Sequence, residues 1–109
     1  MAQFDVHLNI GRQQQTIPFV VLVQSSLYDS YRRRVVVPLV RRSMFSGSAV
    51  LNESRMNPVF NVAGVEVVLH PLEIVSVALE QLGEKIASLA EDGSRIADAM
   101  DELLTQAWK

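Results

Sequence analysis

The sequence of 109 residues contains no cysteine, and this absence removes several kinds of site. Disulfides, thiolate zinc centres and cysteine nucleophiles are all excluded. The apolar runs, such as residues 18–23, are far shorter than the ~20 residues that a membrane-spanning helix needs. The first residues show no basic leader followed by an apolar block. We therefore expect a cytoplasmic protein with no membrane segment.

Sequence motifs for catalysis are also missing. There is no glycine-rich phosphate loop, no HExxH zinc motif and no GxSxG nucleophile motif. The two histidines, His7 and His70, have no acid or nucleophile at a recognisable spacing. His7 falls on the outward side of an alternating segment, where an ordinary surface histidine is expected. The sequence thus predicts a protein that is not an enzyme, with no catalytic residue, no metal site and no cofactor.

The composition is that of one small globular domain. Apolar residues make up 49% of the chain, enough to fill the interior of a single domain over residues 1–109. Residues 1–55 carry seven Arg or Lys and three Asp or Glu, whereas residues 56–109 carry three and nine. A basic half can bind nucleic acid or an acidic peptide, but a solvated and partly self-complementary surface is the simpler explanation.

Five segments have the apolar alternation or the β-branched content of strands. They are residues 3–8, 17–23, 33–39, 58–62 and 65–69. Ala63 and Gly64 form a tight turn between the last two. Pro38 has no N–H to donate and is expected to mark a strand end or a bulge. Residues 72–89 are ambiguous, because a proline could open a helix there while residues 74–77 look like a strand.

The pattern changes in the last part of the chain. Apolar residues recur there at the spacing of one helix face. They are Ile96, Met100, Leu103, Leu104 and Ala107. Glu91 and Asp92 near the expected start and Lys109 at the end suit the helix dipole. We therefore predict a β-rich part over residues 1–82 and a C-terminal helix over about residues 89–108.

Arg32, Arg33 and Arg34, at the head of the third strand, have two interpretations. Beside two tyrosines, they could bind phosphates and stack on bases. Alternatively, successive strand side chains point to opposite faces, so that Arg32 and Arg34 share one side while Arg33 pairs with Asp29. The second, structural interpretation is favoured.

A set of short matches runs collinearly along nearly the whole chain, from residue 3 to about residue 107. They are Gln3-Phe4, Phe19-Val20, Val23-Gln24-Ser25, Asp29, Arg33-Arg34, Val36, Pro38-Leu39, Asn57-Pro58-Val59, Ser76-Val77, Leu82-Gly83-Glu84, Ala87, Leu89 and Ile96. No single match is diagnostic. Their order and spacing together resemble the CcdB family, the toxins of bacterial addiction modules.

The resemblance implies a mainly β (α+β) fold: an SH3-like antiparallel β-barrel with a C-terminal α-helix, assembled as a homodimer. It implies the toxin of a type II toxin–antitoxin module for plasmid maintenance, which inhibits DNA gyrase by binding its A subunit and trapping the cleaved-DNA complex. A cognate antitoxin with a disordered tail neutralises such a toxin. The two together repress their operon, so that operator DNA is bound only through the antitoxin complex. Neither catalysis nor a cofactor is involved.

In this family the gyrase-facing surface combines the loop after the second strand with the end of the terminal helix. The implied contacts on this sequence are Leu27, Tyr28, Asp101 and Leu104. The family ends in Trp-Gly-Ile, whereas here the only tryptophan, Trp108, comes three residues late and is followed by Lys109. Three residues turn a helix by about 300°. Trp108 would therefore lie near the expected side, one turn further out, and we include Trp108 and Lys109 in the surface.

The antitoxin surface and the target leave alternatives open. We expect antitoxin contacts at Arg32 and Arg34, because an acidic or amphipathic tail favours the basic half. One alternative function is a MazF-like endoribonuclease, which shares the barrel and would use the arginines to bind phosphate. Another is a diverged, inactive toxin that acts only as an antitoxin-binding co-repressor.

Overall fold

The computed structural model describes residues 2–45 and 54–106. Within these ranges the strands are β1 (Asp5–Leu8), β2 (Phe19–Leu22), β3 (Arg33–Arg41), β4 (Val59–Val62), β5 (Val65–Leu69), β6 (Val75–Ala78) and β7 (Lys85–Ser88). The helix α1 (Gly93–Asp101) continues into a π-helical segment η7 (Glu102–Gln106). Short 3₁₀ turns are η1 (Ser26–Tyr28), η2 (Arg42–Met44), η4 (Pro71–Glu73), η5 (Leu79–Gln81) and η6 (Ala90–Asp92).

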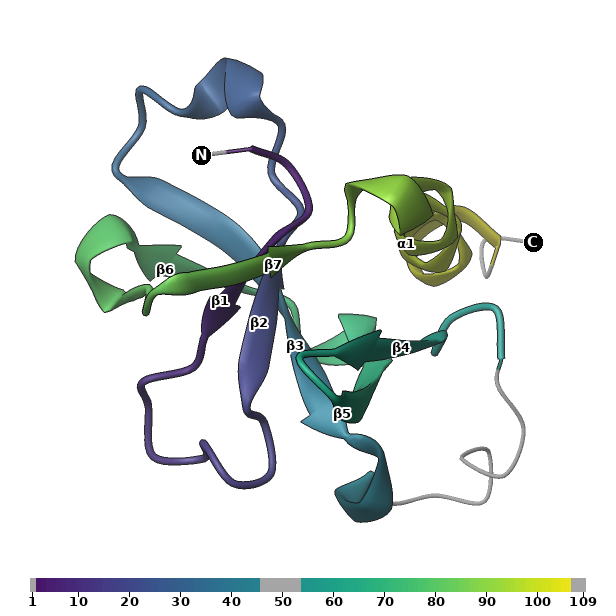
Figure 1. The fold of residues 1–109 in the computed structure, drawn as a ribbon. Helices are drawn as coiled ribbons and strands as arrows, with labels where there is room; N and C mark the ends of the chain where they lie inside the picture. Colours follow the sequence, from purple (N-terminus) through teal and green to yellow (C-terminus); the bar gives the residue numbers. More distant parts are fainter. Residues whose placement is uncertain (1, 46–53, 107–109) are drawn as a thin grey trace.

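The strands of the described residues form one curled antiparallel sheet in the order β4-β5-β3-β2-β1-β7, and β6 also pairs with β3. Figure 1 shows α1 beside one end of this curled sheet. The predicted architecture, a mainly β fold built on a curled antiparallel sheet with a C-terminal helix, is confirmed. No helix in the described residues is long and apolar enough to cross a membrane.

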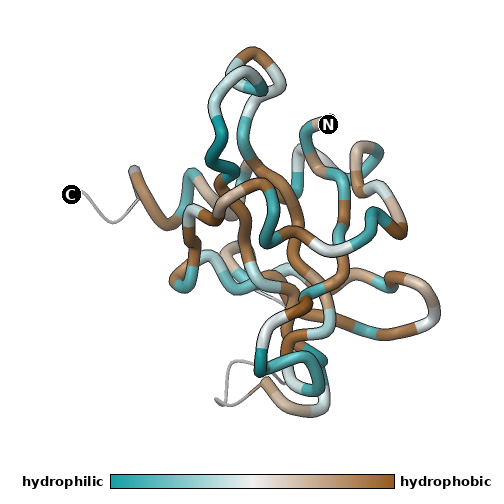
Figure 2. The backbone as a smooth tube through the Cα atoms, turned by 90° about the vertical axis from the view of Figure 1, so that its left-hand side faces the viewer, coloured by the Kyte–Doolittle hydropathy of each residue, from teal (hydrophilic) through white to brown (hydrophobic). Residues whose placement is uncertain are grey.

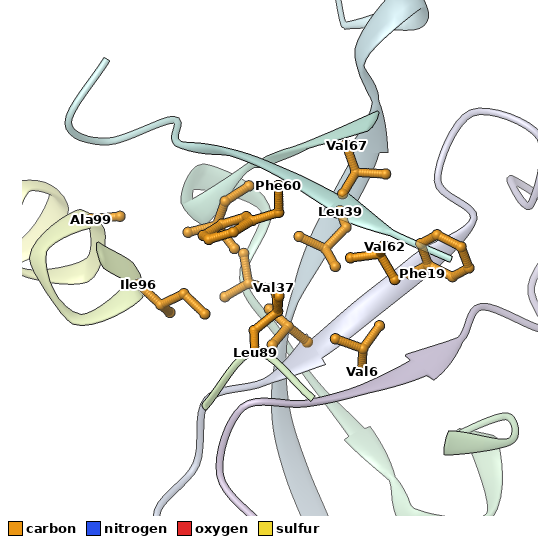
Figure 3. Close-up of a cluster of buried hydrophobic side chains, with 12 residues drawn as sticks. Val6, Phe19, Val37, Leu39, Phe60, Val62, Val67, Leu89, Ile96 and Ala99 are labelled. Atoms are coloured by element: carbon orange, nitrogen blue, oxygen red, sulfur yellow. The ribbon is translucent and has the colours of Figure 1, made fainter. Parts of the chain in front are cut away.

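The hydrophobic core lies inside the curl of the sheet, with α1 closing one end (Figure 3). Strand and helix residues contribute together. The buried cluster consists of Val6, Phe19, Val21, Val37, Leu39, Phe60, Val62, Val67, Leu69, Leu89, Ile96 and Ala99. Figure 2 shows the same distribution as hydrophobic colour along the central strands. The expected apolar stripe of the helix is thus confirmed at Ile96, which is fully buried.

The β4–β5 hairpin follows directly from its sequence. Ala63 and Gly64 both have positive φ angles, 51° and 82°. A two-residue turn with two positive φ angles matches the right-handed twist of the strands that it joins. The register pairs Val62 with Val65 on either side of it. The predicted tight turn is therefore confirmed.

Pro38 lies in the middle of β3, not at a strand end or a bulge as expected. It pairs with Val20 of β2 on one side, and its carbonyl accepts from His70 N at 3.1 Å on the other. The N and C=O of one strand residue point to the same side, so the ring nitrogen also faces away from β2. On that side, β3 pairs with β6 as far as Val36, and its pairing with β5 starts at Leu39. Pro38 fills the gap between them, where no N–H is needed.

The helix α1 begins at Gly93, a few residues after the predicted start near residue 89, because the 3₁₀ turn η6 precedes it. Residues 85–88 form β7, which pairs with β1 (Asp5 with Ser88, Val6 with Ala87), so the β-rich part extends to residue 88. The ambiguous stretch contains β6 and β7, which confirms the strand at residues 74–77 to within a residue. A Cβ at Gly93 would lie 2.6 Å from the Phe4 ring, so glycine allows α1 to start against that ring.

His7 is buried, not on the surface as predicted. It is 5% exposed, and its Nδ1 lies 2.9 Å from the Gly83 carbonyl oxygen. The alternation was right in placing His7 opposite Val6, but the turn between β6 and β7 covers that outer side of β1. The Glu84 carbonyl in this turn also accepts a hydrogen bond from Leu8 N of β1 at 2.9 Å. Long-range packing therefore decides the burial of His7.

Candidate functional site

The loop between β2 and β3 raises an apolar tip above the sheet. Its one helical turn, η1, is capped by Ser25, whose Oγ accepts from Leu27 N at 3.2 Å. Leu27 is 84% exposed and Tyr28 is 54% exposed. Figure 1 shows this loop projecting from the sheet, and Figure 2 shows hydrophobic colour at its tip. The two predicted loop contacts therefore lie side by side in the chain and are both open to a partner.

Tyr31 extends this surface, although it was not among the predicted site residues. It is 65% exposed, and its ring lies 6.2 Å from that of Tyr28, with the ring planes tilted by 58°. We call Leu27, Tyr28 and Tyr31 the loop patch. An aromatic pair at this distance is mutually attractive, which favours a fixed arrangement. The sequence signal was two tyrosines three residues apart around a short turn.

The loop patch is fastened to the sheet by polar groups. Gln24 donates from Nε2 to the Tyr28 carbonyl at 3.2 Å and accepts at Oε1 from Val35 N at 2.9 Å. Arg34 donates to carbonyl oxygens of the loop and lies 3.8 Å from Asp29 Oδ1. Arg33 was expected to pair with Asp29, and this expectation is wrong, because the next residue, Arg34, does so. The loop turns back over β3, which brings Asp29 to Arg34.

The three arginines have different environments. Arg34 is 4% exposed, Arg33 donates to Ser76 Oγ at 3.0 Å, and Arg32 is exposed and bonds Glu80 at 2.7 Å. Arg32 and Arg34 were expected to share one side, but Arg34 is buried, whereas Arg32 and Arg33 are exposed. Hydrogen bonds from its own backbone and then from Arg32, together with the Arg32 charge, lower the pKa of Glu80.

At the helix end, the described residues place two of the predicted contacts on the surface. Asp101 is exposed at the end of α1, and Leu104 is 70% exposed in η7. Figure 1 shows the β2–β3 loop and the end of the terminal helix apart in space. A single chain therefore does not bring the two predicted contact regions together. Trp108 and Lys109 lie outside the described residues.

A second exposed apolar surface surrounds β6. Four side chains near this strand are 38–63% exposed. They are Leu72, Ile74, Val75 and Leu79, and we call them the β6 patch. Within the described residues β6 pairs with β3 only, so its other edge has no strand partner. A free edge beside apolar side chains is a common site of pairing with another chain.

The described surface has several hollows, of about 110 to 490 Å³. A groove of about 170 Å³ between β6 and the sheet is lined mainly by apolar residues, among them Val20, Pro38 and Val77. A hollow of about 250 Å³ lies beside His70, whose Nε2 is 4.0 Å from Glu73 Oε2. An acid thus accompanies this histidine, contrary to the sequence reading, because η4 turns Glu73 back towards it. The described residues contain no group of three or more potential metal ligands.

Comparison with known proteins gives a family and a fold. The family model described as CcdB protein matches residues 3–106. No curated protein sequence matches the chain. The structure is similar to that of the Mycobacterium tuberculosis toxin MazF-mt6, with a TM-score of 0.67 and 14% identity over 90% of this chain and 93% of that one. It is also similar to an endoribonuclease in complex with its cognate antitoxin from Mycobacterial species. That TM-score is 0.73, with 12% identity over 100% of this chain and 99% of the other.

These neighbours contradict the prediction that the chain is not an enzyme. One of them is described as an endoribonuclease, and it is similar over the full length of this chain. That prediction depended on the absence of familiar hydrolase motifs. Because a protein of this fold cleaves RNA, the missing motifs do not argue against an enzyme.

Proposed function

Since the chain belongs to the CcdB family, we propose that it is the toxin of a type II toxin–antitoxin module that inhibits DNA gyrase. It binds the gyrase A subunit and traps the cleaved-DNA complex. The observation that carries this proposal is the loop patch, because an exposed apolar pair stands where the family has its gyrase contacts. Leu27 and Tyr28 are the pair, and both are open to a partner.

The end of the terminal helix supplies the second half of the proposed gyrase surface. Asp101 and Leu104 are exposed there, and Trp108 and Lys109 follow in the sequence. Loop and helix end lie apart in one chain, so gyrase contacts them at separate points or across two copies of the toxin. Fully burying a leucine or an aromatic side chain contributes about 1.5–3 kcal/mol, so the apolar members carry most of the binding energy.

A gyrase cleavage assay tests the loop. Purified protein is titrated into gyrase, plasmid and ATP, and linear DNA is counted after detergent and protease treatment. The double variant Leu27→Ser/Tyr28→Ser should need at least tenfold more protein for the same cleavage. Ile10→Ser is the matched control, because Ile10 is 55% exposed in a different loop. Equal potency of the loop variant and the wild type would contradict the proposed surface.

Trp108 is proposed to replace the displaced tryptophan of the family. As an interface anchor, its removal in Trp108→Ala should weaken gyrase binding by about 2 kcal/mol or more. Growth arrest on overexpression is the simplest readout, in a host with sensitive gyrase. Arrest that survives the substitution would show that this ring is not the anchor.

The partners of the proposed toxin are a second copy and a cognate antitoxin, in the cytoplasm. For the homodimer we favour the β6 patch, since two such edges can pair antiparallel with self-complementary apolar side chains. Val75→Lys should shift the protein to monomer in analytical ultracentrifugation, whereas Ile10→Lys should not. A dimer that persists in Val75→Lys would place the interface elsewhere.

For the antitoxin, exposure favours Arg32 over Arg34 as a direct contact. Operator DNA is bound only by the joint complex, through which the two proteins repress their operon. Arg32→Ala should weaken capture of the antitoxin tail, measured by calorimetry with the tail peptide. The effect should shrink at high salt in the wild type, because an exposed charge contact is screened. A wild-type affinity insensitive to salt would contradict an arginine contact.

An endoribonuclease is the second candidate function, favoured by the structural likeness to such an enzyme. Incubation with RNA, analysed on denaturing gels, separates the two. If the wild type cleaves RNA and Arg33→Ala abolishes this cleavage, the target is RNA and not gyrase. A protein that neither arrests growth nor cleaves RNA, but still represses with its antitoxin, would be a co-repressor only.

A further inference from the structure

We propose that Arg34 is a positioning residue that holds the loop patch in its binding arrangement. The inference deepens the proposed function and rests on it for the identity of the target. Its structural part concerns the loop alone. Arg34 enters the sheet at the head of β3 and is 4% exposed, so it touches no partner directly.

The guanidinium of Arg34 is bonded almost entirely to the loop. Nη1 donates to the Tyr31 carbonyl and, at 3.0 Å, to the Arg33 carbonyl. Nη2 donates to the Asp29 carbonyl at 2.8 Å. Nε faces Asp29 Oδ1 at 3.8 Å. One side chain thus satisfies three carbonyl oxygens between residues 29 and 33, on the returning half of the loop.

The loop has no apolar interior that could replace these bonds. None of the residues of η1 is buried, and all members of the loop patch are more than half exposed. Order in such a segment comes mainly from hydrogen bonds, beside the Tyr28–Tyr31 ring pair. Gln24 fastens the outgoing half, through the Tyr28 carbonyl and Val35 N. Arg34 fastens the returning half.

The chemistry of the site requires a guanidinium. Its planar fork offers several donors in fixed directions, and it remains charged when it is buried. Lysine has three donors on one nitrogen and cannot reach carbonyls on two sides in the same plane. A charge in this place also needs compensation, which the carbonyl dipoles and the Asp29 carboxylate provide.

A loop that is already ordered binds its target without the cost of ordering it. Loss of the Arg34 fork should therefore leave the loop patch present but mobile. The complex with gyrase should weaken, mainly through faster dissociation. The strands below should be less affected, because their buried residues belong to a separate cluster.

The test compares Arg34→Ala with the matched control Arg33→Ala in the full chain. Arg33 is adjacent and also hydrogen-bonded, but its side chain bonds Ser76 of β6 and not the loop. Amide hydrogen exchange over residues 26–31 should be at least tenfold faster in Arg34→Ala only. Gyrase A affinity should fall at least tenfold in the same variant. Millimolar methylguanidinium should restore slow exchange, while methylammonium should not.

Three results would overturn the inference: unchanged loop exchange in Arg34→Ala, equal loosening in Arg33→Ala, or full rescue by Arg34→Lys. If Arg34→Ala does not fold, Arg34→Met takes its place, since it keeps a long unbranched side chain without the donors. A wild-type protein that does not bind gyrase would refute the proposed target, whereas the exchange experiment would still decide whether Arg34 positions the loop.

Discussion

The close approach of Gly83 to β1 predicts a large effect of a single methyl group. A Cβ at this position would lie 2.4 Å from the Leu8 carbonyl oxygen and 2.9 Å from Ile10 Cγ2. The first neighbour is backbone in a paired strand, so it cannot rotate away. In Gly83→Ala the turn must move off β1.

Movement of this turn breaks identifiable bonds. The Gly83 carbonyl holds His7 Nδ1, and the Glu84 carbonyl accepts from Leu8 N, both at 2.9 Å. Overpacking costs about 1–3 kcal/mol, and each lost hydrogen bond costs about 0.5–1.5 kcal/mol. Gly83→Ala should therefore destabilise the protein by at least about 2 kcal/mol.

Urea unfolding followed by circular dichroism measures this loss. With a slope of about 2 kcal/mol/M, the midpoint should fall by about 1 M or more. Gly64→Ala is the control, because a Cβ there meets nothing within 4 Å and only the positive φ angle opposes it. That strain costs about 1–2 kcal/mol. If Gly83→Ala is less destabilising than Gly64→Ala, the turn yields easily and its role in covering His7 is refuted.

Three further predictions concern single contacts. Ile96→Ala should destabilise the protein by about 2–5 kcal/mol, since Ile96 is fully buried between helix and sheet. A shift of the urea unfolding midpoint by less than about 0.5 M would refute this. Arg95→Met should cost about 1 kcal/mol in thermal unfolding, because Arg95 lies 4.5 Å from the Phe60 ring centroid and bonds the Val59 carbonyl; no loss would refute a stabilising contact. Glu80 has a lowered pKa, so its contact with Arg32 stabilises above the unfolded value near 4.5 and is lost as the pH falls through the folded pKa. The stability difference between wild type and Glu80→Gln should therefore vanish at acid pH, and a difference that grows there would refute it.

Local patterns were sufficient for much of the sheet. The alternation of Val6 and Leu8 and the Ala63-Gly64 turn each report on neighbours in sequence, and both were correctly assigned. The exposed tip at Leu27 and Tyr28 was located through the family resemblance, which depends on order and spacing along the chain and not on three-dimensional contacts.

Features that depend on distant segments were not accessible from the sequence. His7 alternates like a surface residue, and only the turn at residue 83 buries it. Arg34 resembles its two neighbouring arginines in sequence, but the returning loop encloses it alone. The end of the β-rich part was placed too early because residues 85–88 become a strand only by pairing with β1. In each case tertiary contact overrode a local preference.

The gap at Pro38 has a consequence for how the molecule can change over time. Because β5 and β6 both pair with β3 but not with each other, the sheet has two parts that are joined along β3. We call them the β6 leaf and the β4–β5 leaf. No residue of β6 belongs to the buried cluster, whereas β4 and β5 contribute four of its members. Substitutions on the β6 leaf are therefore decoupled from the integrity of the interior. Partner choice on that face can diverge rapidly, while the other leaf preserves the scaffold.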